Sequence, residues 1–325
     1  MTNKMELAKT VNKRMNWLDW MKAIGMYLIV YGHYTSYGHE FIYTFSVPLF
    51  FVISGFLFKK EENIRIFFKK NFYNLILPML LMVILVQIRK NVPLILNGTF
   101  EVTKIPQICL GFLIGDQKVL GACWFIYTLF IIKAILQITP TSKHLHIIMS
   151  FIFSIICIWL AKNENYLQNA IANVFLSYPF FIIGLALKKY KGSLNKGFGK
   201  KNEIAMFLFF ILITGICTYF NGNVWVYLND YGKSFILYII GGFCGTANIY
   251  MLCKWLDNVR LSAVSTISNG SIVILGLHYM FIRYTKIAPS LDLVSALVLL
   301  LLFVPIIKLC ERYCPIILGF YRIKK

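Results

Sequence analysis

The stretch MKAIGMYLIVYGHYTSY, residues 21–37, gives the clearest indication of how this chain folds and where it acts. The stretch is almost wholly apolar, yet it contains Lys22 and His33, and Asp19 lies three residues before the lysine. Eleven residues of α-helix make three turns plus about 20°, so Lys22 and His33 share one helix face, about 16 Å apart along the axis. An ionisable group inside a membrane span is a candidate site residue by default.

The composition of the whole chain is that of a membrane protein. Of its 325 residues, 58% are hydrophobic and 14% are charged, and the mean hydropathy is +0.69. Apolar runs that approach or exceed the roughly 18–20 residues needed to cross a bilayer recur along the whole length. No small-residue cleavage site follows the first run, so we interpret that run as a retained helix and not as a signal peptide. The sequence therefore predicts an all-α, polytopic transmembrane helical bundle.

The apolar runs predict about ten transmembrane helices, which places both termini on one side of the membrane. We expect a single integral-membrane domain over 1–325, with a helical core at 15–311 and basic tails at 1–14 and 312–325. The segment 106–115 is too short to cross and is expected to be interfacial or re-entrant. The expected spans are 18–36, 41–58, 71–90, 122–139, 145–162, 169–188, 202–221, 233–255, 266–285 and 289–311.

The distribution of basic residues predicts the orientation. The net charge is +20, and with the N-terminus in the cytoplasm the lysines and arginines on the cytoplasmic side outnumber the others by roughly three to one, as the positive-inside rule requires. Both tails are therefore expected to be cytoplasmic. The basic excess indicates topology and attraction to anionic lipid headgroups, and does not imply binding to nucleic acid. The eight cysteines are scattered, mostly inside apolar runs, so we expect neither disulfides nor a metal site.

Other polar residues of the apolar segments are candidates for a shared cavity. Pro48 follows Ser46 in the second span and can bend that helix towards His33, and Ser54 lies further along the same span. His278 is the other intramembrane histidine, and it is expected at nearly the depth of His33. A structural hydrogen bond to a neighbouring helix explains His278 as well as a place in the site does.

Several candidates also have a simpler interpretation. Lys22 and Lys133 are predicted near the inner ends of their spans, where an ammonium group can extend to the headgroups, and this is the favoured interpretation for Lys133. Trp124, at the outer start of the same span as Lys133, suits an aromatic belt as well as a cavity wall. Asn229 lies in an outward loop beside Tyr227, where it suits contact with sugar hydroxyls or an ordinary turn.

Two stretches, RMNWLDWMKAIGMYLIVYGH (14–33) and FSVPLFFVISGFLF (45–58), resemble the signature of the integral-membrane acyltransferase-3 family. In that family a basic residue, ten further residues and a histidine occupy the first helix, and a Pro-Leu-Phe-Phe and Ser-Gly-Phe segment follows. Lys22 and His33 match this pattern residue by residue. Three later stretches resemble further landmarks of the family, in the right order: ACWFIYTLF (122–130), YPFFIIGLALKK (178–189) and ISNGSIVILGLHYMF (267–281).

The resemblance implies a ten-helix membrane enzyme, expected in a bacterial cytoplasmic membrane. Such an enzyme moves an acyl group, usually acetyl from acetyl-CoA, to a hydroxyl of a glycan or glycolipid. Acetyl-CoA is then a donor substrate, and no bound cofactor is expected. On this interpretation His33 is the general base, Lys22 holds the donor, and Asp19 orients or balances Lys22. Lys69 and Lys70 are further candidates for donor binding.

The chain departs from the family pattern at two places. Many members have a histidine where this chain has Ser46, and many have a second basic pair where this chain has Tyr73 and Asn74 ahead of Pro78. The second departure weakens the assignment of Lys69 and Lys70 to the donor.

A secondary transporter with an intramembrane His/Lys/Asp relay is the alternative function. The absence of a visible internal repeat and the clustering of the ionisable residues on one helix count against it. A transient acyl-histidine is a variant of the enzyme mechanism. A scaffold or sensor without turnover would leave Lys22 and His33 unexplained.

Overall fold

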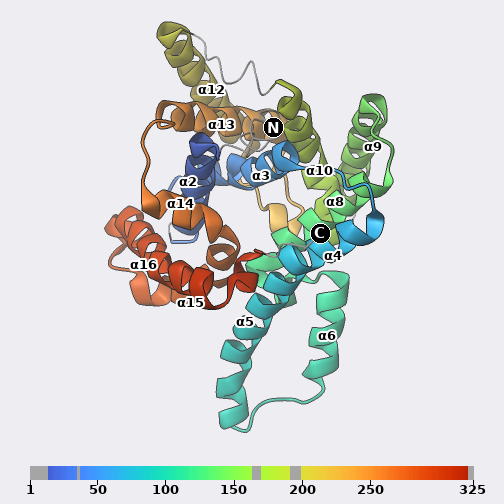
Figure 1. Ribbon diagram of the computed structural model, residues 1–325, viewed down its shortest axis with the longest axis vertical. Coiled ribbons are helices and arrows are strands. Elements are labelled where there is room, and N and C mark those ends of the chain that lie inside the picture. Colours follow the sequence, from blue (N-terminus) through green and yellow to red (C-terminus); the bar gives the residue numbers. More distant parts are fainter. Residues whose placement is uncertain (1–13, 35–36, 163–169, 191–198, 321–325) are drawn as a thin grey trace, which may run out of the picture.

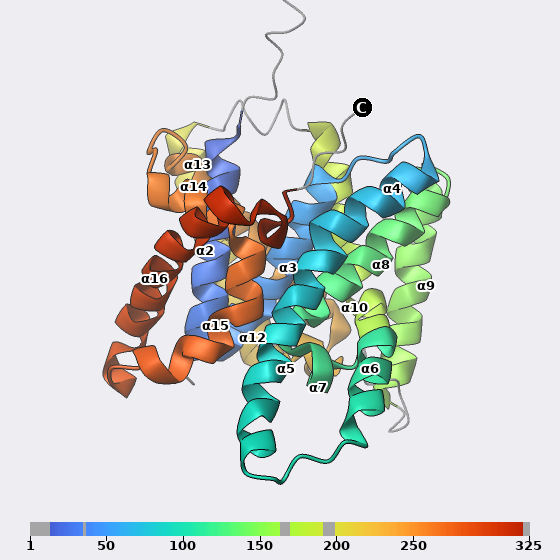
Figure 2. The ribbon, with the colours of Figure 1, turned by 60° about the horizontal axis from the view of Figure 1, so that its bottom comes forward.

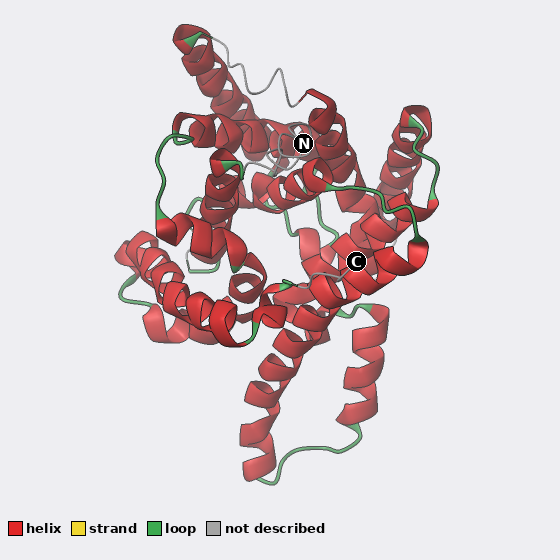
Figure 3. Ribbon diagram, in the orientation of Figure 1, coloured by secondary structure: helices red, strands yellow, loops and turns green. Residues whose placement is uncertain are grey.

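The computed structural model describes residues 14–34, 37–162, 170–190 and 199–320, and within them helices account for nearly everything (Figures 1 and 3). The one β pairing in this part of the chain is an isolated bridge between Trp225 and Asp230. The long helices are α2 (Asn16–Gly32), α3 (His39–Leu57), α5 (Leu77–Leu96), α8 (Trp124–Ile138), α9 (Lys143–Lys162), α10 (Ala170–Leu187), α12 (Lys200–Asn221), α13 (Phe235–Trp255), α15 (Ser271–Thr285) and α16 (Asp292–Tyr313). Shorter elements are α4 (Ile64–Asn71), η1 (Phe72–Ile76), α6 (Lys104–Ile114), α7 (Gln117–Leu120), η2 (Gly121–Cys123), η3 (Lys188–Tyr190), η4 (Val226–Leu228), α14 (Ser262–Asn269), η5 (Pro289–Leu291) and η6 (Pro315–Leu318).

The helices make this a multi-pass membrane protein. Among the described residues, 7 helical segments are long and apolar enough to cross a bilayer, and an eighth joins them if the bent pair α14 and α15 counts as one span. Helix α2, with 17 residues, runs beside α3. The fold class predicted from the sequence is thereby confirmed, while the number of ten crossings stays a prediction. The 7 segments are His39–Leu57, Ile64–Leu96, Gln117–Ile138, Lys143–Leu160, Lys200–Asn221, Phe235–Trp255 and Pro289–Tyr313.

The bundle has two distinct ends, seen along its side in Figure 2. Helix α2 begins at one end, and α4 and the last described element, η6, also lie there. We call this end the terminal face. The turn between α5 and α6 projects from the opposite end, which we call the hairpin face. The start of α2 and the element η6 thus lie at the same end of the bundle.

Close contact between α3 and α10 forms the centre of the bundle. A Cβ added to Gly55 of α3 would clash with the carbonyl oxygen of Phe181, and one added to Gly184 of α10 would clash with the carbonyl oxygen of Val52. The two glycines therefore let the backbones touch, as small residues do at helix contacts in membranes. Pro48 lies inside the same α3 helix, near its middle.

The predicted span at 266–285 is wrong in one respect, because it is not one straight helix. The chain bends by 87° between α14 and α15, at Gly270. A Cβ at this glycine would clash with the side chain of Ile307 on α16, so the bend depends on a close helix contact. The break falls in the polar stretch SNGS (268–271), and composition alone does not show how far the chain turns there.

Two other segments can be compared with the prediction, one of which is longer than expected and the other as short as expected. The predicted span at 71–90 is longer in the structure, because α4, the π-helical turn η1 and α5 form one segment over Ile64–Leu96. Helix α6, in the segment expected not to cross, has only 11 residues, as predicted. The predicted basic tails lie largely outside the described residues.

Candidate active site

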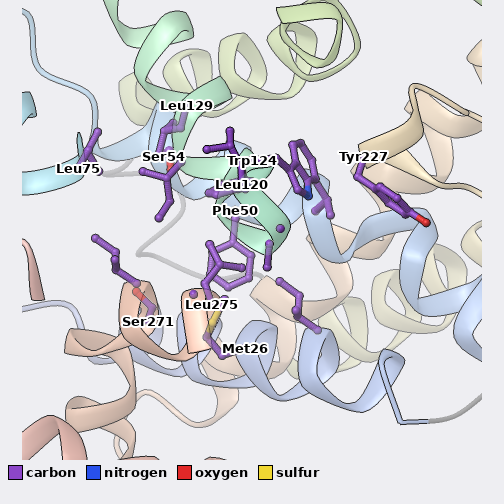
Figure 4. A pocket seen from close by; sticks show the side chains of 18 of the residues that line it. Met26, Phe50, Ser54, Leu75, Leu120, Trp124, Leu129, Tyr227, Ser271 and Leu275 are labelled. Carbon is purple, nitrogen blue, oxygen red and sulfur yellow. The ribbon is translucent and has the colours of Figure 1, made fainter. Parts of the chain in front are cut away.

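A cavity of about 870 Å³ runs through the bundle between α2, α3, α5, α8 and α15. At the terminal face its wall includes Lys59 and Glu61, and at the hairpin-face end it includes Trp225 and Tyr227. The middle is apolar. Figure 4 shows Phe50 between Leu75 on one side and Tyr227 on the other.

The charged residues of the cavity wall are almost all basic. Among the described residues that line it, six lysines and arginines face a single carboxylate, Glu61. The basic ones are Lys22, Lys59, Lys70, Lys133, Arg89 and Lys90. The first four lie in the half nearer the terminal face, and the last two lie on the outer part of α5.

His33 stands at the end of α2 nearer the hairpin face, where it is the C-cap residue of the helix. Its Nδ1 atom lies 2.8 Å from the hydroxyl of Tyr279 and 3.2 Å from the hydroxyl of Tyr43. The rings of His33 and Tyr279 are 4.4 Å apart between centroids. Two tyrosines, from α15 and α3, therefore hold the imidazole in one orientation.

The partners of Tyr43 favour one tautomer of His33. Tyr43 donates its only hydroxyl proton to the carbonyl oxygen of Gly32, at 2.7 Å, because a carbonyl can only accept. Toward His33 the Tyr43 oxygen is then an acceptor, which favours the tautomer with the proton on Nδ1 and the lone pair on Nε2; Tyr279, at 2.8 Å, can accept that proton or donate to a bare Nδ1. Nε2 makes no hydrogen bond to any described residue. His33 lines the cavity, and in the tautomer that Tyr43 favours its Nε2 is a basic nitrogen.

His278 lies behind His33 and does not line the cavity. It is fully buried, and its ring stacks on that of His33 with centroids 5.0 Å apart. Its Nδ1 lies 2.9 Å from the carbonyl oxygens of Ile274 and Leu275, so this nitrogen must carry the proton. Its Nε2 is buried without a hydrogen-bond partner in the described chain. The sequence placed His278 at the depth of His33 correctly, and its contacts make it a support for that ring.

Lys22 and His33 line the same cavity, as their shared helix face predicts. Lys22 makes no hydrogen bond or ion pair with the described residues. Lys70, also predicted for the donor, lines the mouth of the cavity and forms an ion pair with Glu61 at 2.6 Å. Lys133 lines the cavity as well, although the sequence favoured an extension to the headgroups.

Two residues predicted for donor binding lie outside the cavity wall. Asp19 is buried, and its carboxylate accepts hydrogen bonds from Arg14 and from the hydroxyl of Ser268, at 2.6 Å. Arg14 also reaches Asn269, at 3.0 Å. Asp19 therefore joins the start of α2 to α14, and its predicted role of orienting or balancing Lys22 stays a prediction. Lys69 is exposed and does not line the cavity.

The predicted serines and tryptophan do line the cavity. The hydroxyl of Ser46 is fully buried without a hydrogen-bond partner in the described chain. Ser54 lies two turns further along α3. Trp124 is buried in the wall, so it is not a residue of a lipid-facing belt.

The loop at 222–232 contributes Trp225 to the cavity wall, a residue that the sequence did not single out. Asn229 adopts the left-handed conformation (φ 60°) in the tight turn that follows η4, a conformation Asn tolerates. It does not line the cavity. Trp225 and Tyr227 of the same loop do, and the Trp225 ring stands edge-on to Tyr43 with centroids 5.3 Å apart. The turn interpretation of Asn229 therefore fits, and the aromatic neighbours face the cavity.

Signals for the missed residues were present in the sequence. Lys133 is the only charged residue of α8, and Tyr279 directly follows His278. Tyr43 lies ten residues after His33, across the connection from α2 to α3. Spacing alone does not show that the tyrosines meet the histidine, because α15 and α2 are far apart in the chain.

Comparison with known families identifies the family of the chain. The model of the acyltransferase-3 family, described as an acyltransferase domain, matches residues 15–312. No curated protein and no solved structure matches the chain significantly. The family match covers both Lys22 and His33 and nearly all of the described helices. The chain therefore belongs to the acyltransferase-3 family and is a membrane acyltransferase.

Proposed function

We propose that the protein transfers an acetyl group from acetyl-CoA to a hydroxyl of a glycan or glycolipid, with His33 as the general base. One observation carries the proposal. A single cavity joins Lys22 and Lys133, which have no ion pair with a described residue, to His33, whose ring two tyrosines hold near the other end. An anionic donor and a hydroxyl acceptor are the substrates that such a pair of ends would serve.

The donor is assigned to the half of the cavity nearer the terminal face, which the positive-inside rule predicts to be cytoplasmic. The phosphates of acetyl-CoA would meet Lys22 and Lys70 there, because ammonium groups bind phosphate as point charges. The apolar wall around Met26 and Phe50 would then enclose the pantetheine arm. Extended along α2, that arm carries the thioester towards His33, about 16 Å from Lys22.

The chemical step needs one proton to move twice. His33 Nε2 takes the proton of the acceptor hydroxyl as its oxygen attacks the thioester carbonyl. The C–S bond breaks, and the sulfur leaves as a thiolate that regains the proton from His33. An acetyl ester and free CoA are the products. Tyr43 keeps Nδ1 protonated and the ring in place throughout.

The acceptor is assigned to the hairpin-face end of the cavity. Trp225 and Tyr227 offer flat rings with an N–H or O–H at the edge, which suits the mixed apolar and hydroxyl faces of a sugar. Tyr43 connects this aromatic group to His33. A hydroxyl held there would lie next to the base.

The test is a direct assay of the purified protein in lipid nanodiscs. Acetyl-CoA is supplied with a panel of glycans and glycolipids, and both free CoA and acetyl ester are measured. His33→Gln should lower transfer by about 10²–10⁴-fold, because the proton-transfer group is lost. CoA affinity and thermal stability should stay close to those of the parent. His144→Gln, an exposed histidine of α9, is the matched control and should retain full activity.

A fully active His33→Gln enzyme would overturn the assignment of the base. A parent protein that leaves acetyl-CoA intact with every acceptor, and instead carries a solute into proteoliposomes with protons, would favour the transporter.

A further inference from the structure

Helix α8 contains a single charged residue, Lys133, in the apolar run WFIYTLFIIKAILQI. A lysine near the end of a span ordinarily extends its ammonium group to the headgroups. Here the side chain lines the same cavity as Lys22 and Lys70, so the three charges share one enclosed space. These lysines come from α8, α2 and α4. Three separate elements thus direct positive charge to one place.

Two other lysines at the same end of the bundle already donate hydrogen bonds to the protein backbone. Lys60 donates to the carbonyl oxygen of Thr139, which follows α8, at 2.7 Å. Lys188 donates to the carbonyl oxygen of Phe58, which follows α3. Both lysines thereby satisfy the free carbonyls at helix C-termini. Lys133, one and a half turns before Thr139, makes no hydrogen bond or ion pair with the described residues.

Among the described residues that line the cavity, one carboxylate faces the three lysines. Lys22, Lys70 and Lys133 share the single carboxylate of Glu61, which pairs with Lys70. Three positive charges and one negative charge leave an excess of two. Like charges held together in an apolar surrounding are unfavourable unless an anion joins them. A ligand with at least two adjacent negative charges would balance this excess.

We propose that Lys133 anchors the acyl donor, forming with Lys22 and Lys70 a cradle for the diphosphate at the nucleotide end of that donor. The inference rests on the proposed function for the identity of the donor. A diphosphate supplies two neighbouring charges and several acceptor oxygens, which three lysines on three elements can contact from different sides. The apolar wall that begins at Met26 and Leu129 would receive the uncharged arm of the donor.

The test separates the phosphates from the thioester. Lys133→Met keeps the length of the side chain and removes its charge, and Lys143→Met, at the exposed start of α9, is the matched control. In nanodiscs, Lys133→Met should weaken CoA binding by about tenfold or more, as the loss of a charge-assisted contact implies. Transfer from S-acetylpantetheine, which lacks the diphosphate, should change by less than about twofold. Lys133→Arg should restore part of the CoA affinity, because the cation is kept.

Inorganic pyrophosphate provides a second arm that does not depend on the identity of the donor. The parent and Lys143→Met should bind it, and Lys133→Met should bind it at least about tenfold more weakly. Equal loss of transfer with both thioesters, or unchanged affinity for both CoA and pyrophosphate, would overturn the proposal. Pyrophosphate binding that requires Lys133, in a protein that neither binds CoA nor cleaves acetyl-CoA, would support the cradle while overturning acetyl-CoA as the donor.

Discussion

The two halves of the cavity differ in how many protein partners their ionisable groups have. Near the terminal face, Lys22 and Lys133 line the cavity and make no hydrogen bond or ion pair with the described residues. Near the hairpin face, His33 is neutral in the assigned tautomer, held by two tyrosines and backed by a second histidine. An unpartnered charge gains most of its stabilisation when a ligand arrives, which suits binding. A ring fixed beforehand needs no rearrangement during the reaction, which suits chemistry.

The contrast between the two halves places the terminal face and the hairpin face on opposite sides of the membrane. Reporter fusions can test this topology directly. A fusion after Lys143, near the terminal face, should report the cytoplasm, and one after Asn97, in the turn of the hairpin face, should report the outside. The reason is the excess of lysine and arginine on the terminal face. Alkaline phosphatase and green fluorescent protein give opposite, all-or-none signals. The same side for both fusions would refute the topology.

Removing the charge of Lys22 should separate binding from chemistry. Lys22→Met should raise the KM for acetyl-CoA by about 10–100-fold, the loss expected for a charged hydrogen bond. The kcat should change much less, because His33 and its tyrosines are untouched. Lys22→Arg should recover part of the affinity. Steady-state kinetics at saturating acceptor measure both constants. A fall confined to kcat would place Lys22 in the chemical step. It would contradict the division of the cavity into a half that binds and a half that reacts.

Tyr43→Phe should produce the converse pattern with a smaller effect. The phenylalanine keeps the ring beside Trp225 but removes the hydroxyl that accepts from His33 Nδ1. Because Tyr279 still lies at 2.8 Å from Nδ1, kcat should fall by only about tenfold, with the KM for acetyl-CoA unchanged. Tyr31→Phe, whose hydroxyl contacts only the backbone of Tyr37, is the control. Loss of CoA affinity in Tyr43→Phe would show that the two halves are coupled.

Much of this arrangement could be predicted from the sequence. Helical periodicity placed Lys22 and His33 on one face, and the structure has both in one cavity. Hydropathy predicted the helical class and the short α6. These features depend on residues close together in the chain, where the geometry of a helix is known beforehand.

The features that could not be predicted concern contacts between helices. Nothing local tells whether Lys133 extends to the headgroups or turns inward, because the outcome depends on how α8 packs against α4 and η1. Spacing placed Asp19 near Lys22, but it could not show that the Asp19 carboxylate contacts Arg14 and Ser268, a residue 249 positions away. The bend at Gly270 depends on Ile307 of another helix.

The basic lining of the cavity also bears on the electrical tightness of the membrane. A passage that serves substrates from both faces is a hazard in an energised bilayer, because protons and metal cations driven by the membrane potential could leak along it. Fixed positive charge raises an electrostatic barrier to cations, as it does in water-conducting channels. With lysines at one end and Arg89 and Lys90 at the other, both ends of the cavity wall would repel cations. The same basic residues that would attract a phosphorylated donor would thus also reduce the leakage of cations through the cavity.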